Sequence, residues 1–178
     1  MHSVKDEAQE KRLQRLRACR EKLQDLTPLK RDCGRVCGAA CCRSLPGEET
    51  GMLLFPGEEA FYADDPAFRI VEGAAGKILV CEGRCEREKR PLACRLFPLL
   101  PLEDEDGQMA ARMDLRARAV CPLSRDGVDG LRGDFRMVVE EVGRQLMEDD
   151  ETADFLRLLK KEQEDLREIR EKLTGKAI

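Results

Sequence analysis

Eight cysteines lie between residues 33 and 121, and they constrain this chain more than any other feature of its sequence. Four of them fall within ten residues, two more are separated by three residues, and two stand alone. They are Cys33, Cys37, Cys41, Cys42, Cys81, Cys85, Cys94 and Cys121. Because only 4% of the 178 residues are aromatic, large rings contribute little to a core, and the thiols are expected to help hold the chain together.

The compartment decides how these cysteines are interpreted. The first twenty residues carry charges throughout, and no apolar stretch is long enough to cross a bilayer, so we expect a cytoplasmic protein without a membrane partner. Cytosolic thiols are kept reduced, and structural disulfides are rare there. The nine cysteines of the chain are also an odd number, which complete pairing does not use. Metal binding is therefore predicted.

Charge argues against a nucleic-acid partner. The net charge is -4, and the 32 basic and 36 acidic residues are interspersed rather than gathered into a basic stripe. The expected partner is a metal ion, and the sequence indicates no particular protein partner.

Sulfur is the expected ligand, because thiolates bind soft metals and the sole histidine, His2, lies at the terminus. Zinc bound by four thiolates and iron, alone or as an iron–sulfur cluster, both fit. The three-residue spacings differ from the two-residue spacing of most zinc ribbons. Neighbouring side chains such as Cys41 and Cys42 point in different directions, so two ions and one polynuclear cluster both remain open.

Residues near the cysteines suggest how such a site is built. Gly34 and Gly38 directly follow the first two cysteines and are expected to provide tight turns and positive backbone torsions. Four arginines are candidates to balance thiolate charge, or else to pair with Glu86, Glu88 and Asp114: Arg43, Arg84, Arg90 and Arg95.

Helices are predicted at both ends of the chain. Leucines and Cys19 form one apolar stripe between Val4 and Leu26, where Cys19 is expected to be buried. After Asp129, helical periodicity returns and is interrupted by the acidic residues 148–151, and Thr152 or Asp150 is expected to cap the last helix. Between these ends, residues 51–57 suggest a short strand or turn, residues 58–63 a helical turn, and residues 77–80 a strand.

The predicted fold is therefore mainly α, with a cysteine-rich, loop-dominated metal-binding core, terminal helices and few short strands. We expect an N-terminal helical arm at 1–30, a cysteine-cluster metal-binding domain at 31–125, and a C-terminal helical hairpin at 126–178 that packs on it.

The cysteine order resembles that of the YkgJ-type cysteine-cluster family, which is described as a zinc- or iron-chelating domain with a CxxxCxxCC-like signature. The similarity covers about residues 33–122 and includes the string Arg90-Pro91, Cys94-Arg95 and Phe97-Pro98. The first cluster has three residues before its cysteine pair, where the signature has two. The resemblance implies metal binding by these cysteines, including as an iron–sulfur cluster, and implies no activity.

Three functions remain open from the sequence. The first is a metal-binding protein without turnover. The second is an iron–sulfur redox or enzyme component, for which no catalytic residue is assigned and whose candidate polar groups are more often solvated surface: Glu58, Glu59, Asp64, Asp65 and Asp114. The third is a thiol redox switch that uses Cys41 with Cys42, or Cys81 with Cys85.

Overall fold

The computed structural model describes residues 4–43, 51–83 and 85–175. His2 and Arg84, both considered from the sequence, lie outside these residues. The α-helices are α1 (Val4–Lys22), α2 (Cys33–Cys37), α3 (Leu92–Leu96), α4 (Ala117–Val120), α5 (Gly133–Leu146) and α6 (Asp150–Thr174). Short 3-10 helices are η1 (Ala40–Cys42), η2 (Glu58–Phe61), η3 (Arg87–Lys89), η4 (Pro122–Asp126) and η5 (Val128–Gly130).

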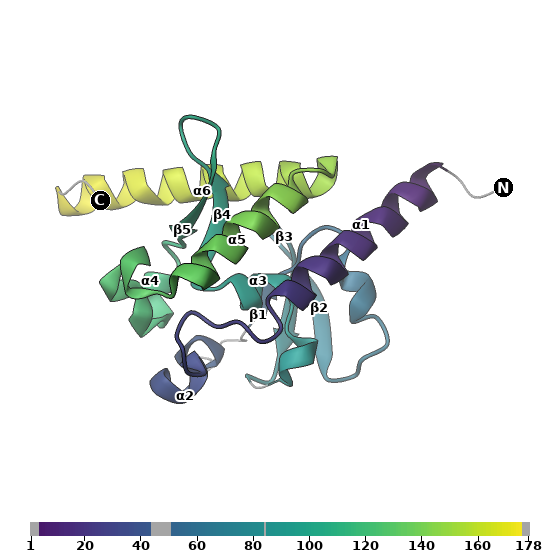
Figure 1. The fold of residues 1–178 in the computed structure, drawn as a ribbon, viewed down its shortest axis with the longest axis horizontal. Helices are drawn as coiled ribbons and strands as arrows, with labels where there is room; N and C mark the ends of the chain where they lie inside the picture. Colours follow the sequence, from purple (N-terminus) through teal and green to yellow (C-terminus); the bar gives the residue numbers. More distant parts are fainter. Residues whose placement is uncertain (1–3, 44–50, 84, 176–178) are drawn as a thin grey trace.

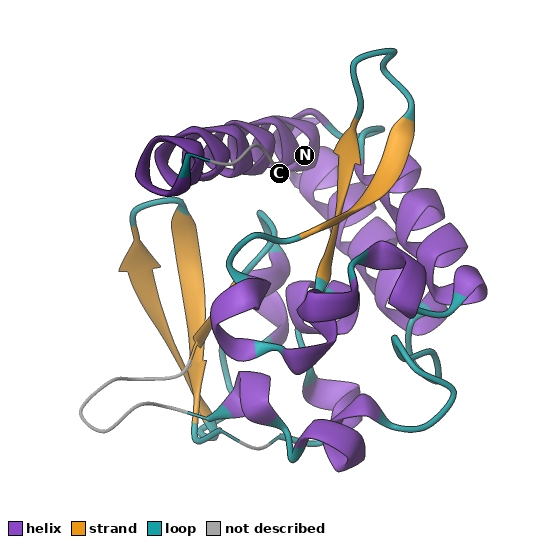
Figure 2. Ribbon diagram, turned by 90° about the vertical axis from the view of Figure 1, so that its left-hand side faces the viewer, coloured by secondary structure: helices purple, strands orange, loops and turns teal. Residues whose placement is uncertain are grey.

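Five strands form two separate antiparallel sheets (Figure 2). They are β1 (Gly51–Leu53), β2 (Phe68–Gly73), β3 (Gly76–Cys81), β4 (Leu99–Glu103) and β5 (Met109–Met113). In the first sheet β3 is central, and Leu79 on it lies opposite Met52 of β1 and Ile70 of β2. The second sheet is the β4–β5 hairpin, which starts from the pair Leu99 and Met113.

The main apolar core joins helices from both ends of the chain to the second sheet. In Figure 1, α5 and α6 lie on the β4–β5 hairpin, and the lower end of α1 lies beside α5. The α1 stripe is buried as predicted, with Leu16, Cys19 and Leu23 at 0% exposure. The core also includes Phe135 of α5 and Phe155 of α6, and the ring of Phe155 meets that of Phe55 edge to face at 5.2 Å.

A glycine lets α5 approach the β4–β5 sheet closely. A Cβ atom at Gly143 would lie 2.5 Å from both the sulfur of Met109 and the Cβ of Pro101. Such distances are too short for any side chain, so the absence of one at Gly143 sets the separation between helix and sheet.

The helix boundaries follow from capping groups. The first helix ends at Lys22 rather than at Leu26. The last helix is capped by Asp149, whose carboxylate accepts a hydrogen bond from the backbone N–H of Thr152 at 3.1 Å, and not by Thr152 or Asp150 as predicted. At its other end Gly175 adopts the left-handed conformation that ends many helices.

The predicted fold class is wrong. The cysteine-bearing region was predicted to be dominated by loops, but it is built from two sheets and short helices. Seven of the eight cysteines lie in a helix or strand or directly next to one, and Cys85 is the exception. Within the described residues, no three His, Cys, Asp or Glu side chains are grouped so that they could hold a metal ion. The structure confirms the strand predicted at residues 77–80, as part of β3, and residues 51–57 contain the short strand β1. Strand β4 was missed because it begins directly after Pro98 and contains Pro101. Most of the short helices were missed because they have too few residues for a helical period.

The division at residues 30/31 and 125/126 stays a prediction. The apolar residues of the three segments share one core, to which α1, the middle region and the two C-terminal helices all contribute. In the described part of the chain, no helix combines the length and the apolar character that a membrane span requires.

Candidate thiolate site

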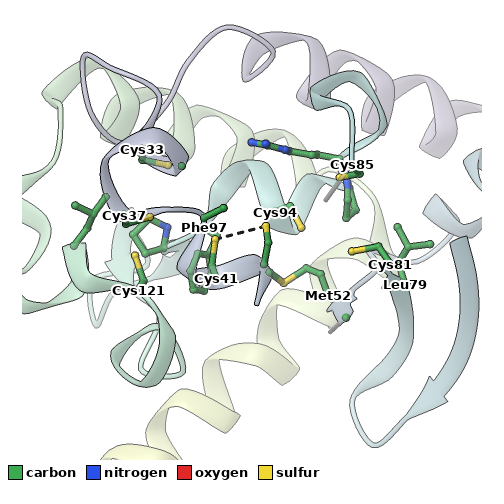
Figure 3. A pocket seen from close by; sticks show the side chains of 18 of the residues that line it. Cys33, Cys37, Cys41, Met52, Leu79, Cys81, Cys85, Cys94, Phe97 and Cys121 are labelled. Atoms are coloured by element: carbon green, nitrogen blue, oxygen red, sulfur yellow. Dashed lines mark hydrogen bonds between the residues drawn. The ribbon is translucent and has the colours of Figure 1, made fainter. Parts of the chain in front are cut away.

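All eight predicted cysteines line one cavity of about 80 Å³. Figure 3 shows Cys33, Cys37 and Cys121 at one end of it, Cys81 and Cys85 at the other, and Cys41 and Cys94 between them. Its remaining walls are mostly apolar and include Met52, Phe68 and Leu79, and Arg90 is the only charged side chain among the described residues that line it. Residues far apart in the chain therefore bring their thiols to one place.

Short elements position the first cluster. Cys33 and Cys37 lie one turn apart on α2, and Asp32 caps this helix by accepting a hydrogen bond from the N–H of Gly34 at 3.0 Å. The chain then reverses through left-handed conformations at Gly38 and Ala39, with φ of 64° and 55°. This turn leads into η1, which carries Cys41 and Cys42. The positive torsion predicted for both glycines is present at Gly38 and absent at Gly34.

The second cluster approaches the first through a glycine. Cys81 ends β3, and the chain turns at Gly83 with φ of 80° before it reaches Cys85. A Cβ atom at Gly83 would lie only 2.6 Å from the carbonyl oxygen of Cys42. Two reasons therefore require glycine at position 83. It adopts the positive φ angle, and it lets the 81–85 turn lie close to the backbone of Cys42.

The last two cysteines come from helices. Cys94 lies in the middle of α3. Cys121 directly follows α4, where its backbone N–H donates to the carbonyl of Ala117 at 2.7 Å. Because α4 packs against η1, Cys121 is held next to the first cluster.

The adjacent cysteines interact directly, with 4.0 Å between the sulfurs of Cys41 and Cys42. This hydrogen bond lowers the pKa of Cys42, and the charge of Arg90 lowers it further against the opposing effect of burial. The same hydrogen bond, together with burial, raises the pKa of Cys41. The two thiols thus hold one proton between them more readily than two.

Burial raises the pKa of most other thiols. That of Cys33 rises to about 11, and those of Cys85, Cys94 and Cys121 also rise, in each case chiefly because the thiolate is desolvated. Nearby thiolate charge adds to the rise. These groups are protonated at neutral pH unless a cation takes the place of the protons.

Thiolate charge at one cysteine also raises the pKa values of its neighbours in the cavity. The pKa of Cys94 is raised by Cys42, Cys85 and Cys81, and that of Cys85 by Cys81 and Cys42. The pKa of Cys33 is raised by Cys37 and Cys121, and that of Cys121 by Cys37. Cys42, Cys33 and Cys94 raise the pKa of Cys41, so these effects connect the whole cavity.

Of the three candidate arginines that the structure describes, Arg90 is the one placed at the thiols, where its charge acts on Cys85 and Cys42. Arg43 is exposed and donates to the carbonyl of Gly38 at 3.1 Å. It therefore stabilises the turn between Cys37 and Cys41 rather than a sulfur.

Arg95 has a structural role. Its side chain is 7% exposed and donates to the backbone carbonyls of Arg20, Arg87, Glu88 and Arg90. A further hydrogen bond goes to the side chain of Gln24. The arginine of the motif thus joins α1 to the loop before α3, and its hydrogen bonds go to carbonyl and amide oxygens rather than to either of the expected partners, a thiolate or a carboxylate.

The carboxylates considered from the sequence divide into surface and buried groups. Glu59 pairs with Lys77 at 2.7 Å and Asp65 with Lys89 at 2.8 Å, both partly exposed, and Asp64 is exposed. Asp114 is buried and is held by Arg116 and Gln163.

Glu58, by contrast, is fully buried although it was expected at the surface. Burial raises its pKa to about 7, and its charge acts on Cys94 and on the buried hydroxyl of Tyr62. That hydroxyl has no hydrogen-bond partner among the described residues. The sequence placed Glu58 beside Glu59 and offered no sign that only one of them turns inward.

The donor set fits a soft metal. Its members are sulfurs only, and a cavity of this size has room for more than one small ion, although the thiols are not drawn together into a closed coordination shell. Metal binding at such a site requires the thiols to lose their protons, so it is coupled to deprotonation of the cavity.

No known protein family, curated protein or solved structure matches this chain. The resemblance to the YkgJ-type proteins therefore stays a prediction that rests on the cysteine order and the RPxxCRxFP string.

Proposed function

We propose that this protein binds zinc or iron, the latter alone or as an iron–sulfur cluster, through the thiolates of the eight cavity cysteines. One observation carries the proposal: four separated stretches of chain direct all eight thiols into a single cavity. In a random arrangement, thiols from residues 33 to 121 would be scattered over the fold. Cys19, the ninth cysteine, packs in the core and serves as the internal contrast.

The chemistry of the cavity supports the same function. Most of its thiols have raised pKa values, so a bare cavity favours protons, whereas a thiophilic metal ion displaces them and gains several sulfur ligands. Arg90 supplies positive charge beside Cys42 and Cys85. The proposed work of the protein depends on reduced thiols, and we therefore place it in the cytosol.

Thiol oxidation is a second candidate, and the Cys41–Cys42 pair favours it. Their sulfurs are 4.0 Å apart, and the lowered pKa of Cys42 increases its thiolate fraction. Oxidation of this pair leaves the other six cavity cysteines without a role, so metal binding explains the positions of more cysteines than thiol oxidation does.

Elemental analysis and an optical spectrum test the proposal on the full chain, purified without oxygen and without an affinity metal. Stoichiometric metal is expected. Iron with sulfide and broad visible absorption identifies a cluster, whereas a colourless zinc protein identifies a four-thiolate centre. A folded protein that contains no metal, refuses added zinc or iron, and forms reversible disulfides would overturn the proposal in favour of thiol oxidation.

A single replacement provides the matched control. Cys19→Ala removes a thiol that lies outside the cavity and is expected to leave the metal content unchanged. Equal loss of metal from Cys19→Ala and from Cys94→Ala would show that the measured metal does not depend on the cavity.

A further inference from the structure

The eight cysteines are not spread evenly around the cavity. Three of them, Cys33, Cys37 and Cys121, gather at one end in Figure 3, and Cys81 and Cys85 gather at the other. The two ends are built from different parts of the fold. One end uses α2 and the residue after α4, and the other uses the end of β3 and the turn that follows it.

At the second end, backbone contacts fix which cysteines come together. The close approach of Gly83 to the carbonyl oxygen of Cys42 brings Cys42 to the turn between Cys81 and Cys85. Cys94 completes this group, since Figure 3 shows it between the two ends of the cavity and on the side of Cys81 and Cys85. Four cysteines thus lie toward the second end of the cavity.

At the first end, Cys33 and Cys37 project from the same face of α2 because they are four residues apart. The packing of η1 on α4 brings Cys121 to the same end. Figure 3 shows Cys41 on the side of Cys37 and Cys121, and it makes this group four. Its sulfur is 4.0 Å from that of Cys42, so the two groups adjoin at this pair.

We propose that the cavity holds two adjacent metal centres, one bound by Cys33, Cys37, Cys41 and Cys121 and the other by Cys42, Cys81, Cys85 and Cys94. This inference rests on the proposed function. Four thiolates complete a tetrahedral zinc site or bind one iron–sulfur cluster, so neither centre needs a thiolate of the other. The peptide bond between Cys41 and Cys42 is the shortest covalent connection between the two centres.

Cadmium-113 NMR of the full-length, cadmium-substituted wild-type protein tests the separation directly. Two resonances in the tetrathiolate region, with no cadmium–cadmium coupling, are expected. Coupling through a shared sulfur, or a single resonance at saturation, would overturn the inference by showing one bridged cluster or one centre. This measurement needs no variant, so it decides the question even if the replacements below impair folding.

Two replacements test the assignment of ligands. Cys121→Ser and Cys81→Ser are each expected to lose about half of the bound metal, because each removes one of the four thiolates of one centre and leaves the other centre complete. The Cys19→Ala protein is expected to keep all of it. If either serine variant keeps its fold by circular dichroism and loses all of its metal, the two centres are not independent and the inference fails.

The outcomes also separate this inference from the proposed function. A wild-type protein that binds no metal would overturn both. A wild-type protein that binds metal in one bridged cluster would overturn the two-centre arrangement and leave metal binding in place.

Discussion

The carboxylate of Glu58 accepts a hydrogen bond from the backbone N–H of Leu92, with 2.7 Å between Oε1 and the nitrogen. Its second oxygen accepts from the N–H of Phe55 at 3.2 Å. The side chain thus satisfies the first N–H of α3, the helix that carries Cys94, and connects it to the end of the β1 segment. This buried carboxylate therefore helps to fix the position of the helix that carries Cys94.

Replacing this carboxylate is expected to destabilise the protein. Glu58→Ala leaves two buried N–H groups without an acceptor, so we expect the free energy of unfolding to fall by about 2–5 kcal/mol in urea denaturation. Glu59→Ala is the control, because its partly exposed pair with Lys77 contributes at most about 1 kcal/mol. Equal losses for the two variants would contradict a special role for Glu58.

The same group predicts a pH dependence. Burial raises the pKa of Glu58 to about 7, above its ordinary value of 4.5, so the folded state holds this proton more tightly than the unfolded state does. Its contribution to stability is full below pH 4.5, declines as the pH rises, and is lost by about pH 7.

Comparison with Glu58→Gln isolates that effect. The free energy of unfolding of the wild type minus that of the variant is expected to fall with pH across this window and to be level above it. Urea denaturation at a series of pH values measures the difference. A difference that stays constant, or that increases with pH, would show that Glu58 does not hold its proton as the structure requires.

Gly83 allows a test of the contact between the two cysteine clusters. Gly83→Ala places a methyl group 2.6 Å from the carbonyl oxygen of Cys42, and the clash is expected to push the 81–85 turn away and reduce the bound metal. Gly107→Ala is the matched control, because Gly107 has a similar φ of 74° and no atom within 4 Å of the added methyl group. Both variants carry torsional strain of about 1–2 kcal/mol, and only the first carries the clash. Equal metal content in the two would contradict the contact.

Metal binding is expected to release protons and to weaken in acid. The raised pKa values of Cys33, Cys94 and Cys121 mean that these thiols hold protons at neutral pH which a bound ion must displace. Competition with a chromophoric chelator should therefore show an affinity that rises between about pH 6 and about pH 8, and an indicator dye in weak buffer should report the protons. Affinity that does not change with pH would mean that the thiols are not the ligands.

The sequence was most informative where one short pattern determines the structure. The three-and-four spacing of Leu16, Cys19 and Leu23 predicts a buried helix face, and the structure confirms it. The spacing of the cysteines also identified the set that lines the cavity. The first pattern depends on residues close together in the chain, and the second depends on residue type, because thiols are rare and chemically distinct.

Other features depend on contacts between distant segments. Arg95 lies next to Cys94 in the chain, which suggested a charge partner, yet its guanidinium faces carbonyls of α1 and of the loop before α3. The inward turn of Glu58 likewise depends on α3, which begins 34 residues later and is too short to show a helical period. Side-chain direction in such cases follows from tertiary packing, which no local pattern contains.

The residues of α2 and η1 are not buried, and neither apolar cluster of the described fold includes any of the eight cavity cysteines. Segment 33–42 therefore has little apolar anchorage of its own, and bound metal would act as its cross-link to the 81–85 turn and to Cys121. Loss of that metal would release this one segment from the cavity, while the main core, which contains none of its residues, stayed folded. Whether metal is bound would then determine whether the ten residues 33–42 are docked on the cavity or detached from it.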